Sequence, residues 1–327
     1  MLTTPLISSD RKPLRQRQRS LRVSFLLLVL IFLVLALFSG CLRPQRKPPL
    51  PPPAPPAGGE PSLSLFDDKT GQTRQIKMEE YLQGVVAAEM DPKWPEEALA
   101  AQAILARTFT LERLGRGGVK ALHGTDVCTS PEHFQAYDPA KINEAVRRAV
   151  EKTRGLIVTY QGQPIRAWFH ADSGGQTTTP AEGLNFREAP TPYIQPVRDV
   201  ATATTWKAEF SAAQLEAALS KLGRKIAPVK SVSVEARDAS GRVVTFKING
   251  VSIPAAELRL ALGSDKMRST LLDTLSFAGG KLTMTGKGWG HGVGMSQWGA
   301  KTMAEQGKTA QEIIQFYFKD VKLEKRW

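Results

Sequence analysis

Apolar and polar residues follow their most regular spacing between residues 78 and 108 of the chain. In 78–90 an apolar stripe returns every three or four positions, which is the spacing of one helix face. The stripe consists of Tyr81, Leu82, Val85 and Val86, and Glu89 continues its four-residue rhythm. Pro95 opens a second apolar run that reaches Thr108, and proline is common at a first helical position. The pattern predicts two helices folded into a hairpin, with the carboxyl group of Glu89 on or beside the apolar face of the first.

The predicted position of Glu89 is unfavourable for helix stability. A negative charge at a helix C-terminus opposes the helix dipole, and burying that charge without a partner costs several kcal/mol. Two interpretations follow. The carboxylate either forms an ion pair with Arg107 or Lys93, or it takes part in chemistry.

Weaker patterns along the rest of the chain predict short strands and further helices. Alternating residues around turns predict hairpins of 63–66 with 75–78, 156–160 with 165–169, and 230–236 with 243–249. Further helices are expected over 142–153, 215–222 and 309–318, a strand over 281–285, and a loop over 115–139. Together these elements predict a mixed α+β fold, mostly of antiparallel strands, with the helical hairpin carrying Glu89.

The N-terminal part of the chain has the pattern of an export segment. Residues 23–38 carry no charge, and the apolar stretch continues to Leu42, enough to cross a hydrocarbon core of about 30 Å. The basic residues 1–22 before it predict a cytoplasmic tail. An uncleaved signal-anchor over 23–42, a cleaved signal peptide and a lipoprotein signal ending at Cys41 are the three interpretations, and all of them export the body. We expect the signal-anchor, which gives a single-pass cell-membrane protein with its domain on the extracytoplasmic side.

Residues 43–62 contain nine prolines and predict an extended spacer between the membrane and a folded body over 63–327. Residues 1–22 and 43–62 hold nine basic and two acidic residues, which accounts for +7 of the formal net charge of +13. The charge therefore does not predict nucleic-acid binding. The mildly basic body suits an anionic polymer such as cell wall, or is an ordinary solvated surface.

Several stretches of the body have distinctive sequences. In chain order they are Tyr81–Met90, Trp94–Thr108, Asp126–Cys128, Gln135–Tyr137, His170–Thr177, Pro192–Asp199, Ser240–Val243, Glu257–Arg259 and Gly288–Ala300. This series resembles the SpoIID/LytB domain family of stage II sporulation protein D. The resemblance implies a lytic transglycosylase that cuts peptidoglycan glycan strands during spore engulfment, together with a cell-wall amidase and other engulfment membrane proteins. It also implies that the essential acid is the glutamate of the Ala-Ala-Glu-Met stretch, here Glu89.

The implied chemistry needs one carboxyl group and no cofactor. Glycosidases normally use two carboxyl groups. In a lytic transglycosylase the 6-hydroxyl of N-acetylmuramic acid (MurNAc) attacks C1 of its own sugar, which gives a 1,6-anhydro product without consuming water. Glu89, kept protonated by apolar neighbours, would give its proton to the bond between MurNAc and N-acetylglucosamine (GlcNAc) and then accept the proton of the 6-hydroxyl.

Candidate substrate-binding residues come from the same stretches. The glycine-rich segment 288–299 offers a backbone that a sugar can approach closely, and it lacks the spacing of a dinucleotide or phosphate loop. Trp298 is a candidate for sugar stacking or for packing. The turn around Ser173 has a structural interpretation, and also a serine-hydrolase one with His123 or His133 as base. The predicted substrate-binding residues are Gln102, Arg107, His170, Ser173, Gly174, Trp289, His291 and Gln297.

His123, Cys128 and His133 have a spacing that suits zinc with one open coordination position. Some members of the resembling family bind zinc here through one histidine and two cysteines. In this chain Phe134 stands where the second cysteine is expected, so His133 would have to replace it. A zinc site and a free buried thiol at Cys128 are the two interpretations.

A second function of a different class also fits the sequence. The domain is then a non-catalytic wall-binding module that stimulates an amidase, as the LytB part of the family name suggests. Both functions require glycan binding, but only the enzyme produces anhydro-muropeptides.

Overall fold

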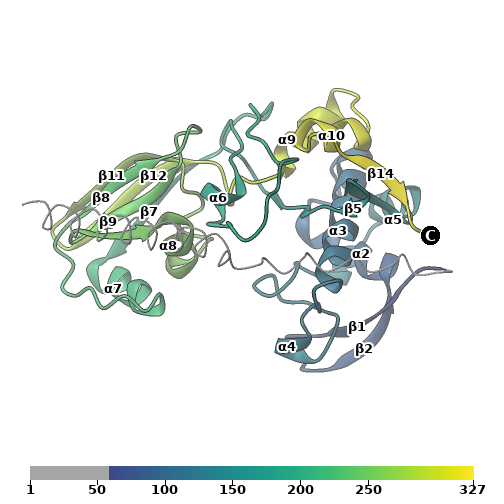
Figure 1. The fold of residues 1–327 in the computed structure, drawn as a ribbon, viewed down its shortest axis with the longest axis horizontal. Coiled ribbons are helices and arrows are strands. Elements are labelled where there is room, and N and C mark those ends of the chain that lie inside the picture. Colours follow the sequence, from purple (N-terminus) through teal and green to yellow (C-terminus); the bar gives the residue numbers. More distant parts are fainter. Residues whose placement is uncertain (1–58) are drawn as a thin grey trace, which may run out of the picture. The chain divides into compact units, whose positions relative to one another are not determined.

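The computed structural model describes residues 59–327 (Figure 1). The predicted cytoplasmic tail (1–22), the membrane segment (23–42) and most of the proline-rich linker (43–62) lie outside these residues. Within the described part, no helix has both the length and the apolar character needed to cross a membrane. The strands of this part form five small sheets, and most neighbouring strands are antiparallel. The predicted α+β class is confirmed.

One hydrophobic core contains the predicted helical hairpin. Its helices are α2 (Met78–Glu89), α3 (Glu96–Leu114), α5 (Glu144–Lys152), α9 (Gln297–Glu305) and α10 (Ala310–Tyr317). Its strands are β1 (Ser62–Phe66), β2 (Thr73–Lys77), β3 (Val127–Cys128), β4 (Leu156–Tyr160), β5 (Gln163–Pro164) and β14 (Lys322–Lys325). Short pieces α4 (Lys120–His123), η1 (Pro139–Lys141) and α6 (Pro180–Gly183) lie in the loops.

Helix α3 is the centre of this core, because α2, α5, α9, α10 and β4 all pack against it. Twelve of its nineteen residues are buried, including five alanines. A helix that is covered on nearly every side needs apolar or small residues all round rather than one stripe, and alanine lets neighbouring helices approach closely. The sequence of α3 therefore explains why it is the central helix.

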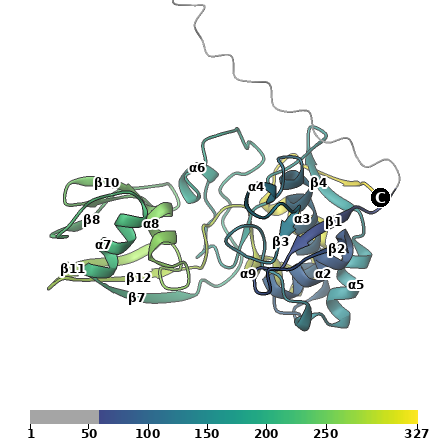
Figure 2. The same cartoon turned by 90° about the horizontal axis from the view of Figure 1, so that it is seen from below.

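A second hydrophobic core lies within residues 205–287. Its strands are β7 (Thr205–Ser211), β8 (Val232–Arg237), β9 (Val243–Ile248), β10 (Val251–Pro254), β11 (Leu272–Ala278) and β12 (Lys281–Lys287). They form two sheets of three strands, in the orders β10-β9-β8 and β11-β12-β7, with helices α7 (Ala212–Lys221) and α8 (Ala255–Leu262) packed beside them (Figures 1 and 2). The hairpin predicted for 230–236 and 243–249 is confirmed as β8 and β9.

The second core is an insertion into the first. The first core includes Tyr193 and Ile194 before the insertion and Val293 after it, and the short strands β6 (Phe169–His170) and β13 (Met295–Ser296) on either side pair in parallel. The prediction that 165–169 pairs with 156–160 is therefore wrong in part. Strand β4 pairs with β14 and with the two residues of β5, while Phe169 pairs with Met295.

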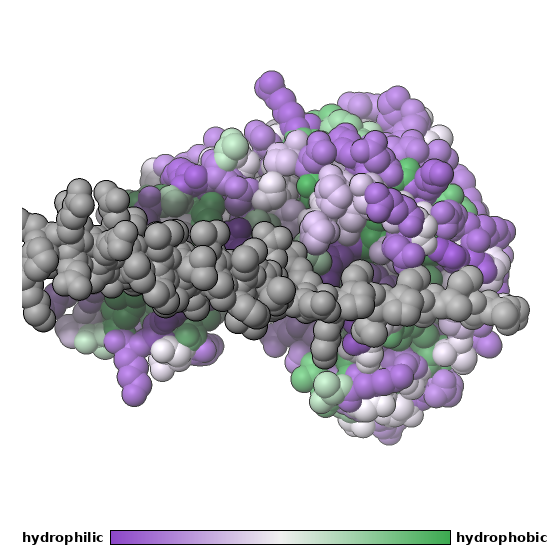
Figure 3. All heavy atoms as spheres, in the orientation of Figure 1, coloured by the Kyte–Doolittle hydropathy of each residue, from purple (hydrophilic) through white to green (hydrophobic). Residues whose placement is uncertain are grey.

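On the part of the surface that is in view in Figure 3, hydrophilic side chains predominate and hydrophobic ones form small separate patches. Among the described residues, large apolar side chains that remain exposed are few, and they include Trp289 and Trp298. Both belong to the glycine-rich segment that returns the chain to the first core.

Candidate functional site

The carboxyl group of Glu89 lies at the C-terminal end of α2 and is partly buried. The backbone N–H of Ala136 donates a hydrogen bond to its Oε1 at 3.0 Å. Within residues 59–327 no basic side chain forms an ion pair with Glu89, so neither Arg107 nor Lys93 is its partner. The ion-pair interpretation of this residue is therefore wrong.

Burial raises the pKa of Glu89 from its ordinary value of 4.5 to about 7. Loss of hydration penalises the charged form, while the Ala136 N–H and the side chain of Gln297 favour it and limit the rise. Near neutral pH the group therefore exchanges its proton readily in both directions. A group that must act first as an acid and then as a base needs a pKa in this range.

Several buried polar groups around Glu89 have hydrogen-bonding capacity that the described residues do not use. Gln297, the first residue of α9, lies beside Glu89, and its Nε2 is 3.4 Å from Oε1 of Gln102. Nε2 of Gln102 has no partner within residues 59–327, and the hydroxyl of Tyr81 and the side chain of Gln135 lie beside each other without a well-formed hydrogen bond. Native proteins leave few such atoms unpaired, so they mark this place as one that a polar ligand can complete.

Sequence reasoning missed three of the groups near Glu89. The sequence placed Tyr81 only in an apolar stripe. Burial is the main cause that raises the pKa of its hydroxyl, and the nearby charge of Glu89 raises that pKa further. Gln135 and Ala136 lie in the Gln135–Tyr137 motif, which was the available signal. The sequence did not indicate that a backbone N–H in that motif faces the carboxyl group.

Trp298, next to Gln297, is partly exposed on α9. Its ring lies 5.0 Å from that of Trp94, centroid to centroid, and Nζ of Lys301 lies 5.5 Å from its ring centroid. Trp94 belongs to the turn between α2 and α3, so the two tryptophans connect the hairpin to the glycine-rich segment. The chain thus places a partly exposed aromatic pair close to the end of the helix that bears Glu89.

Glycines in the segment 288–294 are needed because other parts of the chain pack closely against them. Gly288 has φ +77° and Gly294 has φ +72°, a region that suits glycine. A Cβ at Gly288 would lie 2.7 Å from the carbonyl oxygen of Asp172, and one at Gly294 would lie 2.0 Å from that of Trp168. The segment therefore runs against the backbone of 168–174.

His170 and His291 lie side by side, with ring centroids 5.5 Å apart. The Nδ1 of His170 is 3.1 Å from the carbonyl oxygen of Val293, and the N–H of Val293 donates to Nδ1 of His291 at 3.1 Å. Burial lowers both pKa values, that of His170 to about 3, and the charge of Arg242 adds to the effect. Both rings are therefore neutral at physiological pH and do not act as acids there.

Ser173 is fully buried in a structural turn. Its hydroxyl donates to Oδ2 of Asp199 at 2.5 Å, and Nη2 of Arg242 donates to its carbonyl oxygen. Gly174 has φ +74° and packs against Leu271. The histidines proposed as a base, His123 and His133, contact each other instead. The geometry therefore favours the structural interpretation over a serine hydrolase.

Comparison with known proteins decides the family. A family profile described as stage II sporulation protein matches residues 67–160, and one described as a domain of unknown function matches residues 198–294. Stage II sporulation protein D of Bacillus amyloliquefaciens is 33% identical over 282 residues, which cover 80% of this chain and 78% of that protein. The chain belongs to the stage II sporulation protein D family.

Two Bacillus subtilis (strain 168) proteins are also similar to this family member. Its stage II sporulation protein D is 32% identical over 284 residues, covering 80% of this chain and 78% of that one. Its amidase enhancer is 29% identical over 292 residues, covering 72% of this chain and 39% of that one. The first profile match contains Glu89, while the second contains the inserted core and extends into the glycine-rich segment.

Arg107 of this stage II sporulation protein D family member lies in the interior of the first core. Its Nε and Nη2 donate to the two carboxylate oxygens of Glu79 at 3.0 and 2.5 Å, and its Nη1 donates to the carbonyl oxygen of Leu156 at 3.0 Å. The side chain is completely buried. The prediction that Arg107 contacts substrate is therefore replaced by a structural role.

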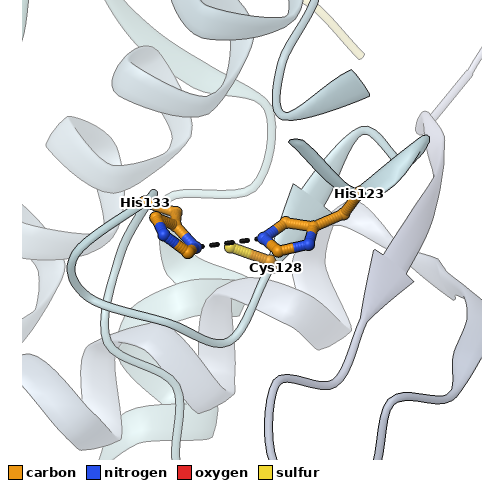
Figure 4. A group of neighbouring side chains, drawn as sticks. All are labelled: His123, Cys128 and His133. Atoms are coloured by element: carbon orange, nitrogen blue, oxygen red, sulfur yellow. Dashed lines mark hydrogen bonds between the residues drawn. The ribbon is translucent and has the colours of Figure 1, made fainter. Parts of the chain in front are cut away.

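His123, Cys128 and His133 converge as the zinc interpretation requires (Figure 4). Nε2 of His123 is 3.0 Å from Nδ1 of His133, and all three ligand atoms lie within 4.8 Å of one another. Tetrahedral zinc holds its nitrogen and sulfur ligands about 3.3–3.8 Å apart, so the set fits the metal after small adjustments. Phe134 is buried against Phe109 and faces the core. The neighbouring His133 is therefore the residue that can supply the third ligand.

Proposed function

We propose that this protein is a peptidoglycan lytic transglycosylase that cleaves the MurNAc–GlcNAc bond with Glu89 as its single acid and base. The observation that carries the proposal is a carboxyl group with a pKa of about 7, free of ion pairs within the described residues, beside unpaired buried polar atoms. The family membership supports it. We further propose that the enzyme acts on the wall during sporulation, in keeping with the names of its Bacillus relatives.

The proposed reaction has two proton transfers at one carboxyl group. Protonated Glu89 gives its proton to the glycosidic oxygen, the bond from that oxygen to C1 of MurNAc breaks, and GlcNAc leaves as an alcohol. The carboxylate then takes the proton of the MurNAc 6-hydroxyl while O6 bonds to C1, which regenerates the acid. Between the two steps the charged form must be tolerated, and the Ala136 N–H and the side chain of Gln297 stabilise that form.

Location and partners belong to the same proposal. A signal-anchor over 23–42 and the spacer over 43–62 would hold the domain outside the membrane and within reach of the wall. A cell-wall amidase is a suitable partner, because it removes the stem peptides that crowd the glycan strand. The similarity to a protein named amidase enhancer supports this pairing.

The same relative favours a second candidate function, that of a wall-binding module that stimulates an amidase without cutting glycan. Digestion of glycan strands already free of stem peptides separates the two. We expect mass spectrometry to detect 1,6-anhydro products with the purified protein alone. If the protein alone releases none but speeds the removal of stem peptides by an amidase from intact wall, the stimulating module is the correct function.

The pKa of Glu89 predicts the pH dependence of the reaction. Because the first step needs the protonated form, kcat/KM, which follows the pKa of the free enzyme, should be level below about pH 6 and fall about tenfold per pH unit above pH 7. Initial rates on soluble stem-free strands between pH 5 and 9 test this. A rate that keeps rising to pH 9 would exclude Glu89 as the proton donor.

The same shift predicts a stability effect that does not depend on catalysis. Because the folded-state pKa of Glu89 is raised, ionisation of this side chain destabilises the fold relative to a neutral side chain. The destabilisation is absent below pH 4.5 and is complete once the pH has risen through 7. Replacing Glu89 with glutamine should therefore have little effect at pH 4 and should stabilise the fold by up to about 3 kcal/mol at pH 9. Urea titrations at both pH values measure the difference.

We also propose that His123, Cys128 and His133 hold one zinc ion. When bound, zinc would tie α4 and β3 to the loop that reaches Ala136, and so fix the N–H that faces Glu89. We expect cobalt(II) added to apo-protein to give a thiolate charge-transfer band near the ultraviolet, absent in Cys128→Ser. Glu132→Gln, an exposed change in the same loop, should retain the band. An unchanged spectrum in Cys128→Ser would exclude the site.

A further inference from the structure

Trp289 exposes a large aromatic ring in the glycine-rich segment. It is 41% exposed although it is apolar, and its backbone exchanges two hydrogen bonds of 2.8 Å with Asp172. The N–H groups of the neighbouring Gly288 and Gly290 donate hydrogen bonds of 2.8 Å to the carbonyl oxygens of Thr204 and Arg268, which hold the backbone on both sides. The ring is thus held on a rigid support and still faces solvent, which is the usual arrangement of an aromatic contact for a ligand.

Arg268 lies over this ring, with its guanidinium carbon 4.4 Å from the ring centroid. The carbonyl oxygen of Arg268 accepts hydrogen bonds from the N–H of Gly290 and from Nε of Arg259 at 3.1 Å, so its backbone is fixed as well. In residues 59–327 the side chain of Arg268 makes no ion pair. A flat apolar ring and a cation without a counter-charge are therefore presented together.

Arg268 also lines a groove of about 540 Å³ on the inserted core. The polar side chains along this groove are Thr205, Lys207, Glu209, Asp265, Lys266 and Arg268. Glu209 is already paired with Lys207 and Lys281, whereas Lys266 and Arg268 have no acidic partner in the described part of the chain. Asp265 also lines the groove, so its three basic and two acidic side chains leave one net positive charge, and Arg268 places a cation at the Trp289 ring.

The groove connects to the candidate catalytic site through consecutive contacts. Thr204, which precedes the groove, donates through its N–H and hydroxyl to Asp172 at 2.7 Å, and Asp172 bonds the backbone of Trp289. The residue before Asp172, Ala171, accepts a hydrogen bond from the N–H of Trp298 at 3.0 Å. Trp298 follows Gln297, which lies beside Glu89.

We propose that Trp289, Arg268 and Lys266 form a second glycan-binding site on the inserted core, which binds the same strand some sugars away from the bond that Glu89 cuts. The ring of Trp289 stacks on a sugar, and the two cations bind carboxylates that the strand carries, such as the lactyl carboxylate of MurNAc after its stem peptide is removed. This inference rests on the proposed function for the identity of the strand. It assigns a role to a region whose family profile carries none.

Binding is measured with the full chain carrying Glu89→Gln, so that cleavage does not complicate it. The probes are stem-free glycan strands from walls stripped of teichoic acid with hydrofluoric acid. We expect Trp289→Ala and Arg268→Ala each to weaken binding about tenfold, and Lys266→Ala about threefold. Leu260→Ala and Lys221→Ala, exposed changes elsewhere on the inserted core, should stay within twofold of the parent. Thermal melting of every variant checks that it is folded.

Two further arms test the chemistry of the ligand. Strands whose carboxylates have been converted to amides should bind the parent about tenfold more weakly, and Arg268→Ala should not weaken that binding further. With unstripped walls, Arg268→Ala should weaken binding by the same factor as with stripped strands. The proposal is overturned if Trp289→Ala and Arg268→Ala both bind within twofold of the parent, if amidated strands bind normally, or if the Arg268 effect needs teichoic acid phosphate. Because cleavage is not measured, these results stand whether or not Glu89 proves catalytic.

Discussion

Replacing Glu89 with glutamine should lower kcat on stem-free glycan strands by roughly 10²–10⁴-fold, the range expected for loss of a general acid. Glutamine keeps the size of the side chain and an oxygen that can accept the N–H of Ala136, so the fold around it should not change. It has no proton to give and no charge to accept one. Release of anhydro-muropeptides, measured by liquid chromatography and mass spectrometry at pH 6.5, is the assay.

A matched control lies on the same helix. Glu80 is exposed near the other end of α2 and makes only a surface ion pair of 3.7 Å with Arg74. Glu80→Gln should retain kcat within twofold, because that carboxyl group is remote from the end of α2. Wild-type product release by Glu89→Gln would exclude catalysis by this residue, whereas loss of strand binding in the same variant would point to a binding role.

Removing Arg107 should produce the largest loss of stability. Arg107→Met deletes the bonds to Glu79 and to the carbonyl oxygen of Leu156 and leaves the carboxylate of Glu79 buried without its counter-ion. Breaking a buried pair in this way costs about 3–5 kcal/mol. The free energy of unfolding from urea titration at pH 7 measures it, with Arg148→Ala, from an exposed pair with Glu96, expected to stay within about 1 kcal/mol.

The double variant Glu79→Met with Arg107→Met tests the cause of that loss. It removes both charges and should recover part of the stability, but not all of it. Glu79 also accepts hydrogen bonds of 3.0 Å from the N–H of Gly155 and from Nε1 of Trp327, which the double variant leaves unpaired. Where Arg107→Met remains folded, its KM for strands should be unchanged. A raised KM at full folding would restore the substrate role that the sequence suggested.

The parts of the fold with a strong local pattern could be predicted from the sequence. The stripe of α2 and the alanine-rich run of α3 predicted the hairpin. Thr309 is the N-cap of α10, and its side chain and that of Glu312 form reciprocal caps, so the start of that helix was predicted almost to the residue. In these elements each residue's neighbours along the chain determine its conformation.

Long-range features had no such signal. Strands β6 and β13 are two residues each, and the whole inserted core separates them in the sequence. A strand of two residues is too short to show an alternating pattern. The inserted core itself was missed as a unit, because its strands are half exposed and only β8 and β9 were predicted as a hairpin. The site shows the same limit. Glu89 and Gln297 were named from their motifs, but the backbone N–H of Ala136 carries no side-chain signature.

The inserted core begins and ends at the same place. Thr205 and Lys287 are directly opposite each other in adjacent strands, and the N–H of Gly288 donates to the carbonyl oxygen of Thr204 at 2.8 Å. A module whose two ends meet can be exchanged or removed by evolution without stretching its host. A protein engineer could therefore join 204 to 288 with a short turn. The shortened chain would keep α2 and α3 with their surroundings and would isolate what the module contributes to the choice of substrate.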